Sequence, residues 1–427
     1  MSEEAPVAEE QPPLRPLLAP ADGVPDVLTS AADLAATIEA MAAGSGPVAV
    51  DAERASGFRY GQRAYLVQLR RDGAGTALID PIALPDLSSL STALAGVEWV
   101  LHAASQDLPC LAEVGMVPDR IFDTELAGRL LGLPRVGLGP IVEAELGLSL
   151  AKEHSAADWS TRPLPESWLR YAALDVEVLV DLRDVLAAKL AESGKLGWAE
   201  QEFDAVRLAS PPPPKPDLWR RRTQAVRDPR GLAVVRELWT TRERVARDAD
   251  IAPGRVLPEA AMVAAAVTKP RSLAQLAELR EFKSRGAARR LRTWHEAVAR
   301  ALALPDAELP PRRPPYEPGS IPAPRSWRDR DPEAAERLEV VKAVVRGRAI
   351  ELDLPQENLL TPDFQRRLAW QPPQPLEGTS VAAFLAGLGA RPWQVDQLAD
   401  RLAAGLSDPG SVLVDDAHGP VDEPAEA

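Results

Sequence analysis

Two carboxylates, Asp51 and Glu53, follow a short apolar run at residues 48–50 of the 427-residue chain. The run Val-Ala-Val is typical of a buried strand, and side chains two residues apart on a strand share one face. Both carboxylates can therefore point at one ion. The same pattern also occurs at turns and at solvated strand edges, so the pair alone leaves both readings open.

A third carboxylate, Asp107, comes shortly after another apolar run at residues 99–101. The residues between them are small or polar, and the acid falls where a helix is expected to begin. An acid in a first helical turn also complements the helix dipole without any chemical role.

A fourth carboxylate, Asp175, lies four residues after Tyr171 in a segment with helical periodicity. We predict one long helix from Pro165 to just before Gly194. The i,i+4 spacing places the phenol and the carboxylate on one helix face, and the two alanines after Tyr171 allow close approach of another element. A chance pair on a surface helix is the structural alternative.

The four carboxylates together predict an oxygen-rich site for divalent cations. Mg²⁺ and Mn²⁺ prefer carboxylate oxygens, whereas Zn²⁺ favours the sulfur and nitrogen ligands that one cysteine and four histidines hardly supply. Two such ions about 3.5–4 Å apart stabilise the attacking and leaving oxygens of an in-line phosphoryl displacement. A tyrosine beside them can orient the attacking water. Its ordinary pKa of about 10 leaves much of the deprotonation to the ions.

The order of these motifs resembles that of the DEDD superfamily of 3′→5′ exonucleases, which have a ribonuclease H-like fold, and specifically the ribonuclease D family. Tyrosine four residues before the last aspartate marks the tyrosine subgroup, since the other subgroup has histidine there. The resemblance covers about residues 28–195 and rests on VDAE (50–53), LHAASQD (101–107), FDT (122–124), DWSTRPL (158–164) and YAALD (171–175).

The resemblance implies a 3′→5′ exoribonuclease that trims structured RNA such as tRNA precursors and releases nucleoside 5′-monophosphates. It implies that Tyr171 aligns the attacking water. It also implies that two divalent metal ions, Mg²⁺ or Mn²⁺, are held by Asp51, Glu53, Asp107 and Asp175.

Three residues near Asp107 have open or structural roles. His102 and Gln106 are candidate substrate-binding residues because they flank the expected site, although a structural role for His102 fits as well. Cys110 follows a proline in an apolar helical pattern, which favours packing in the core.

Apolar runs at 48–50, 65–69, 77–79 and 99–101, separated by helical periodicity, predict an α/β exonuclease domain with a mixed sheet flanked by helices. Two later regions are helical throughout and are separated by proline-rich stretches. The predicted organisation is a disordered segment at 1–27, the exonuclease domain at 28–206, a proline-rich linker at 207–226, an HRDC domain at 227–305, a second linker at 306–330, a second HRDC-like helical domain at 331–406 and a disordered acidic tail at 407–427.

The two helical regions read as a duplicated module. Residues 227–305 are similar to an HRDC domain, which follows the nuclease in ribonuclease D, by position, by length and by the segments DIAPGRVLP and LAELREF. Residues 249–257 recur in pattern 103 positions later, and Gly286 matches Gly389 at the same offset.

Charge divides the chain in the same way. The net charge is −14, yet residues 207–300 hold 21 basic against 10 acidic residues, and the rest of the chain holds 28 against 53. We expect the basic module to hold the body of the RNA by phosphate contacts, while the 3′ end enters the acidic metal site. On this view, removing the module should hardly change turnover of a short single strand.

Composition excludes several other classes. One cysteine excludes a disulfide framework, and the acidic, proline-rich start is not a secretory signal. No run of 18 apolar residues could span a membrane, so we predict a cytoplasmic protein with no membrane partner. A 3′→5′ DNA exonuclease, a non-catalytic nucleic-acid-binding protein and an acidic scaffold remain as alternatives, although the intact acids disfavour a non-catalytic role.

Overall fold

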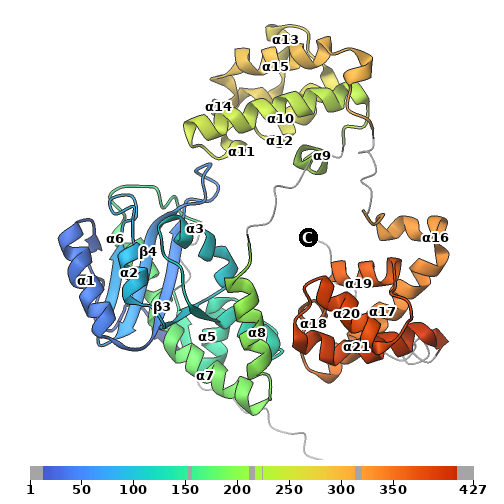
Figure 1. Cartoon of the computed structure of the whole chain (residues 1–427). Coiled ribbons are helices and arrows are strands. Elements are labelled where there is room, and N and C mark those ends of the chain that lie inside the picture. Colours follow the sequence, from blue (N-terminus) through green and yellow to red (C-terminus); the bar gives the residue numbers. More distant parts are fainter. Residues whose placement is uncertain (1–12, 152–155, 211–216, 224, 313–319, 411–427) are drawn as a thin grey trace, which may run out of the picture.

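The computed structural model describes residues 13–151, 156–210, 217–223, 225–312 and 320–410. The described chain forms an α/β domain followed by two all-helical domains (Figure 1). This is the predicted fold class. Most of the predicted acidic tail, and residues 1–12 of the predicted N-terminal segment, lie outside the described residues.

A six-stranded mixed sheet forms the centre of the α/β domain, in the order β2-β5-β4-β3-β6-β7. β4 runs antiparallel to β3 and to β5, and the other pairs are parallel. All four strands predicted from apolar runs are present. The strands are β2 (Val27–Leu28), β3 (Ser45–Arg54), β4 (Ala64–Asp72), β5 (Gly75–Ile79), β6 (Glu98–Leu101) and β7 (Arg120–Asp123).

The two faces of β3 meet different surroundings because its side chains alternate. Val48 and Val50 belong to the large core that also holds residues of α1 (Ala31–Ala43). Ala49 packs on the opposite face, against Val176 and Leu179. Asp51 and Glu53 share the parity of Ala49 and therefore lie on this second face.

The helix predicted from Pro165 to Gly194 is two helices, so the prediction of one helix was wrong. α6 (Glu166–Glu177) ends and α7 (Leu179–Glu192) begins on either side of Val178, whose φ of −98° and ψ of −9° depart from helix geometry. The break lets α6 lie against β3, β4 and β5, while α7 contacts β6 and α4. The other elements of the domain are α2 (Ser88–Ala93), η1 (Ala104–Gln106), α3 (Leu108–Glu113), α4 (Thr124–Leu130), α5 (Leu138–Leu146) and α8 (Leu196–Arg207).

The predicted disorder of residues 1–27 was wrong for its described part. β1 (Arg15–Leu17) pairs in parallel with β8 (Leu148–Leu150), and β2 begins at Val27. Proline stiffens this stretch and still permits pairing, because an edge strand does not need every N–H group.

The first helical domain has a core of its own around Trp294 and Phe282. Trp219 of α9 (Leu218–Arg222) joins that core, so this part of the predicted linker 207–226 is a docked helix, while residues 211–216 and 224 lie outside the described residues. The remaining helices are α10 (Pro229–Ala249), α11 (Pro253–Val256), α12 (Glu259–Thr268), α13 (Leu273–Glu278), η2 (Arg280–Lys283), α14 (Arg285–Ala288), α15 (Leu291–Ala303) and η3 (Asp306–Glu308).

The second helical domain begins earlier than predicted. Trp327 of α16 (Trp327–Arg330) is fully buried and packs on Trp370 at a ring distance of 4.9 Å, so the end of the predicted linker 306–330 belongs to this domain. Its other helices are η4 (Pro324–Ser326), α17 (Pro332–Glu351), α18 (Gln356–Leu359), α19 (Pro362–Trp370), α20 (Gly378–Gly387) and α21 (Pro392–Ser407).

The two helical domains repeat one plan at the offset found in the sequence. The long helices α10 and α17 begin after Asp228 and Asp331, which cap them in the same way, 103 residues apart. Each long helix is followed by a residue with φ of +47°, Asp250 in the first domain and Asp353 in the second. The short helices α11 and α18 and the long helices α15 and α21 then follow in register.

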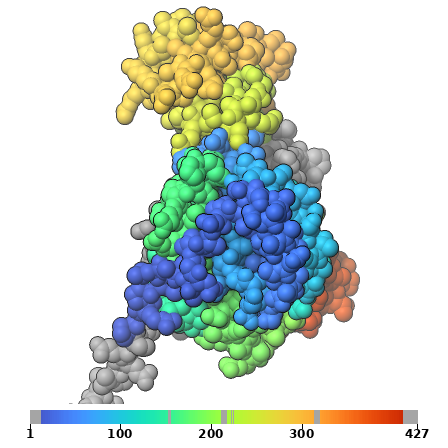
Figure 2. All heavy atoms as spheres, turned by 90° about the vertical axis from the view of Figure 1, so that its left-hand side faces the viewer, coloured from blue at the N-terminus to red at the C-terminus, as the bar shows by residue number. Residues whose placement is uncertain are grey.

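The second helical domain shares a continuous core with the α/β domain. Trp198 stacks on Trp393 at 4.9 Å with an interplanar angle of 14°. Glu202 accepts hydrogen bonds from Arg391 at 2.9 and 2.6 Å and from the Trp393 indole at 2.9 Å. The first helical domain instead contacts a different part of the α/β domain and lies above it in Figure 2.

Among the described helices, none combines the length and the apolar composition that crossing a bilayer requires.

Candidate active site

Three of the predicted acids converge on the second face of the sheet. Asp51 and Glu53 come from β3, and Asp175 comes from α6, which lies across that face. Each offers a carboxylate oxygen, and these oxygens all lie within 4.8 Å of one another. The close packing of α6 rests on Ala172 and Ala173, which are fully buried against the sheet.

Asp107, the fourth acid, approaches from the loop between β6 and α3. It is only 5% exposed, and its Oδ1 lies 3.7 Å from an Arg54 guanidinium nitrogen. Burial, and then the charge of Asp51, raise the pKa of Asp107 to about 8. Asp107 is therefore electrostatically part of the cluster, although it does not belong to the tight group of three.

The acids of the cluster outnumber the cation beside them, Arg54. Burial raises the pKa of Asp51, Glu53 and Asp175 above the ordinary range. For Glu53 the charges of the three other acids raise the pKa further, and Arg54 opposes this shift. Bringing in cations would relieve the repulsion. A set of hard carboxylate oxygens in this environment fits Mg²⁺ or Mn²⁺.

Tyr171 stands beside the cluster, where the predicted helix spacing puts it. Its hydroxyl is hydrogen-bonded to Asp175, and its ring lies 6.4 Å from the ring of the buried Trp159. Burial, and then the charges of Asp175 and Glu53, raise the pKa of Tyr171 far above its ordinary value. The phenol therefore stays protonated at neutral pH and can act as a hydrogen-bond donor.

Asp123 of the FDT motif positions the loop that carries Asp107, a role that was not predicted from the sequence. Its carboxylate accepts the N–H groups of Ala103 and Ala104 at 3.0 and 2.8 Å, and it caps α4 by accepting those of Glu125 and Leu126. The signal was available, because an aspartate before Thr-Glu is typical of a helix N-cap.

Two further residues at the site were also missed. Arg54 is the nearby cation, and its Nη2 also donates to Gln106. Gln68 is fully buried directly opposite Asp51 on β4, and its amide has no hydrogen-bond partner among the described residues. Directly opposed side chains lie on the same face of a sheet, so this amide borders the acids. A buried amide without a partner fits a site that also holds ions and water.

The two candidate substrate-binding residues differ in their surroundings. The His102 Nδ1 is 2.9 Å from the Thr124 hydroxyl, which donates to the Leu101 carbonyl. Burial lowers the pKa of His102 to about 4, so the ring is neutral and is held by the fold. Gln106 is exposed and bonded to Arg54.

Comparisons with known families match three segments of the chain. Residues 25–191 match a family described as 3′-5′ exonuclease, residues 231–301 match the HRDC domain, and residues 320–406 match a 3′ to 5′ exonuclease C-terminal domain.

Individual relatives agree. Proteins named Ribonuclease D from Gluconacetobacter diazotrophicus and from a Jannaschia species are each 32% identical over 67% of this chain, and the matches cover 75% and 77% of those proteins. The structure of a protein from Bifidobacterium adolescentis is 38% identical with a TM-score of 0.83, covering 92% of this chain and all of that one. The structure of Escherichia coli RNase D is 27% identical with a TM-score of 0.62, covering 90% of this chain and 98% of that one.

The mixed sheet, the clustered acids and these matches define a 3′→5′ exonuclease of the DEDD class, whose members depend on divalent metal. The chain belongs to the ribonuclease D family, and it is a 3′→5′ exoribonuclease with an HRDC domain.

Proposed function

We propose that this exoribonuclease trims the 3′ ends of structured RNA, such as tRNA precursors, in the cytoplasm and releases nucleoside 5′-monophosphates. The observation that carries the proposal is the convergence of Asp51, Glu53 and Asp175 within 4.8 Å on one face of the sheet. The Escherichia coli relative is described as an exoribonuclease involved in structured RNA processing, which supports the substrate class.

In this proposal Asp51, Glu53, Asp107 and Asp175 hold two divalent ions, Mg²⁺ or Mn²⁺. When bound, such ions stabilise charge on the attacking and leaving oxygens of the phosphodiester. The chain contributes the rigid frame, since β3 and α6 fix three ligands and the N–H bonds to Asp123 fix the loop of Asp107.

Tyr171 orients the attacking water through its hydroxyl oxygen, which can accept a hydrogen bond from the water while the O–H, kept protonated by its raised pKa, donates to Asp175. Its bond to Asp175 and its packing near Trp159 hold the ring in place. His102 supports the loop behind the site through Thr124, and Gln106 remains a candidate substrate contact because it is exposed beside Arg54.

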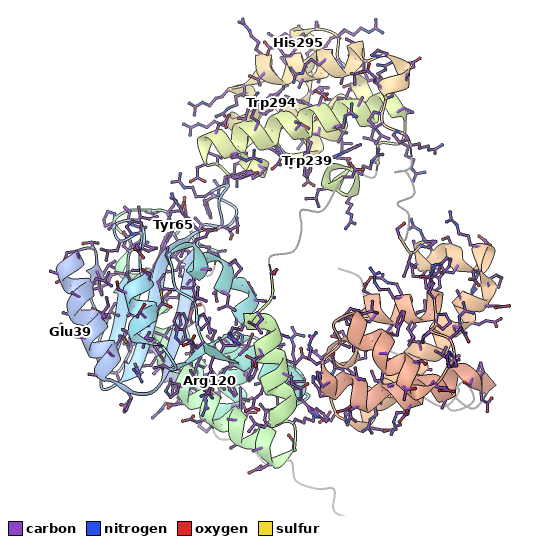
Figure 3. The ribbon with its side chains drawn as sticks, viewed as in Figure 1. Glu39, Tyr65, Arg120, Trp239, Trp294 and His295 are labelled. Atoms are coloured by element: carbon purple, nitrogen blue, oxygen red, sulfur yellow. The ribbon has the colours of Figure 1, made fainter. Side chains whose placement is uncertain are left out.

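The HRDC domain holds the body of the RNA. Five exposed cations lie within residues 280–292: Arg280, Lys283, Arg285, Arg289 and Arg292. Among the described residues, none of these five forms an ion pair within 4.0 Å. Figure 3 shows the side chains of this domain, with Trp294 and His295 on α15. Cations that are not neutralised by neighbouring acids are free to contact phosphates.

The central experiment offers the purified protein 5′-labelled RNA and DNA of matched sequence, with Mg²⁺, Mn²⁺ or a chelator. We expect a ladder that shortens from the 3′ end on RNA, nucleoside 5′-monophosphate as product and no reaction with the chelator. Faster digestion of DNA would instead assign a DNA exonuclease.

Direction of attack is tested on modified ends. A 3′-terminal phosphate should slow digestion strongly, because the terminal nucleotide must enter the site. Early internal fragments from a circular RNA would mean an endonuclease and would contradict the proposal.

A further inference from the structure

The loop at residues 55–63 joins the strand that carries Asp51 and Glu53 to β4. The pairing of β3 with β4 is irregular at its end, with a register shift between Glu53 and Arg54. Ladder hydrogen bonds therefore do not by themselves fix the backbone immediately after Glu53. What holds this loop also holds the end of the strand that carries the acids.

The corner between α10 and α11 of the HRDC domain forms hydrogen bonds with four main-chain groups of this loop, within residues 57–61. The Asp250 carboxylate accepts the N–H groups of Tyr60 and Gly61, both at 3.2 Å. The Ala252 N–H donates to the Phe58 carbonyl at 3.0 Å, and Arg255 Nε donates to the Gly57 carbonyl at 2.7 Å.

Side chains of the loop extend the contact in two directions. The Tyr60 ring packs against the core of the HRDC domain, with the Arg247 guanidinium 5.5 Å from its centre. The Phe58 ring lies under Arg255 at 4.0 Å and belongs to the exonuclease cluster that contains Trp159 and Tyr171. The loop thus connects the HRDC core with the aromatic packing around the tyrosine of the site.

Arg63, at the end of the loop, forms a second connection between the HRDC domain and the exonuclease domain. Its guanidinium lies 3.8 Å from Asp250 and donates to the Tyr65 hydroxyl at 3.2 Å. Figure 3 shows Tyr65 at the edge of the α/β domain that faces the HRDC domain, and Figure 2 shows the two domains in direct contact.

The equivalent corner of the second helical domain docks elsewhere. Asp353 has the same φ of +47°, but its carbonyl accepts a hydrogen bond from Lys195 at 3.1 Å and it packs against Gly132. Neither partner belongs to the acidic cluster. The repeat therefore provides a matched pair of corners, of which only the first contacts the loop beside the acids.

We propose that the corner from Asp250 to Arg255 is a positioning element of the exonuclease site, which fixes loop 55–63 and through it the end of β3 and the packing of Tyr171. The HRDC domain then contributes to the chemical step itself, in addition to holding RNA. This inference rests on the proposed assignment of Asp51, Glu53 and Tyr171 to the site, and it replaces the expectation that loss of the domain leaves turnover of short strands unchanged.

The test uses the full chain and a single-stranded RNA too short to reach the basic residues 280–292. Asp250→Gly removes both bonds to the loop, and glycine keeps the positive φ without strain. We expect its single-turnover rate at saturating enzyme to fall about tenfold with little change in RNA affinity, because small displacements at a catalytic centre are costly. Asp250→Asn keeps an acceptor oxygen and should recover most of the rate.

Asp353→Gly is the matched control, with the same substitution at the same φ, and its rate should stay within about twofold of the parent. Hydrogen exchange at the amides of Tyr60 and Gly61 gives a readout independent of activity and of metal. It should accelerate in Asp250→Gly and stay unchanged in Asp353→Gly.

Unchanged rates in Asp250→Gly, together with faster exchange at Tyr60 and Gly61, would overturn the proposal, since the corner would then only tether the domain. If Asp250→Gly unfolds the HRDC domain, Arg255→Gln removes the bond to Gly57 from an exposed side chain, and its rate decides between the same outcomes. Failure of the site assignment is seen separately, as full activity in Asp51→Asn.

Discussion

One buried carboxylate of the exonuclease domain, Asp80, differs from the acidic cluster in how its charge is balanced. Asp80, at the end of β5, is 6% exposed and receives two hydrogen bonds from Arg162 at 2.7 and 2.8 Å and one from the Ile82 N–H at 2.8 Å. These bonds and the charge of Arg162 outweigh burial and lower the pKa of Asp80. In the acidic cluster, burial instead raises the pKa of Asp51 and Glu53, and the charges of the neighbouring acids raise that of Glu53 further.

The difference distinguishes a carboxylate that stabilises the fold from one that is kept available. If the four acids served only stability, each would be expected to have a close cationic partner, as Asp80 has in Arg162. In the cluster, the cation Arg54 lies beside the acids, and its Nη2 is 3.7 Å from the Asp107 Oδ1, which is longer than a hydrogen bond. The cluster therefore costs stability in the metal-free protein and gains it back when cations bind.

The largest expected effect is on activity. Asp51→Asn and Asp175→Asn should each lower the exonuclease rate about a thousandfold or more, because each removes a charge from the group that would hold the ions. Their free energy of unfolding in chelator should stay equal to that of the parent or rise, since each variant relieves repulsion. Steady-state rates and urea unfolding measure the two quantities, and near-parental rates in both variants would contradict the site.

Asp80→Asn should show the opposite profile. It leaves the Arg162 guanidinium without its counter-charge, which should cost about 2–4 kcal/mol of unfolding free energy, reduced from the full penalty of a buried pair because Arg162 is about one-third exposed. The folded fraction should keep its catalytic rate. A variant as stable as the parent would show that the pair does not stabilise the fold.

The pH dependence of the stability of the metal-free protein further distinguishes the acidic cluster from Asp80. A raised pKa means that the folded state of Asp107 still binds a proton between its unfolded value of about 4 and its folded value of about 8. The stability in chelator should therefore fall as pH rises through this window, by up to about 1.4 kcal/mol per pH unit from this group. Thermal unfolding at pH 5.5 and pH 8 measures the effect.

Asp107→Asn is the control for this dependence, and it should flatten the pH profile. Added Mg²⁺ or Mn²⁺ should stabilise the parent more at pH 8 than at pH 5.5, because the ligands must be deprotonated. A profile that rises with pH in the parent and is unaffected by Asp107→Asn would contradict the raised pKa.

The smallest effect is expected at His102, a half-buried titratable group held by a hydrogen bond to Thr124. Asparagine can replace that donor, so His102→Asn should cost less than about 1 kcal/mol and change the rate less than about threefold. The parent should lose stability as pH falls from about 6.5 towards 4, where the folded ring resists protonation, and the variant should lose less. A large loss of rate with the fold intact would make His102 a substrate contact.

The sequence predicts the main strands because their apolar runs are uninterrupted, as in β3 and β6. It does not reveal β7, in which only two apolar residues stand between Arg120 and Asp123, nor β1, whose pairing with β8 joins segments more than 130 residues apart. Propensity is local, whereas such pairings depend on tertiary contacts.

The same limit explains which residues of the site could be found. The acids and Tyr171 stand in motifs with fixed spacing, and the structure brings Asp51, Glu53 and Asp175 together. Gln68 could not be placed beside the acids, because its position depends on the register between β3 and β4. The contact of Asp250 with Tyr60 joins residues 190 apart and follows from no local pattern.

The core shared by the exonuclease and C-terminal helical domains gives the chain an order of assembly that differs from its order of synthesis. The stacked pair Trp198 and Trp393, and the bonds of Glu202, join the end of the exonuclease domain to the C-terminal helical domain in one cooperative block. The HRDC domain, with its separate core, is in effect an insertion between the two parts of that block. A protease cut before or after the HRDC domain would leave the exonuclease and C-terminal domains held together by their shared core. Calorimetry would record the unfolding of the HRDC domain as a separate transition.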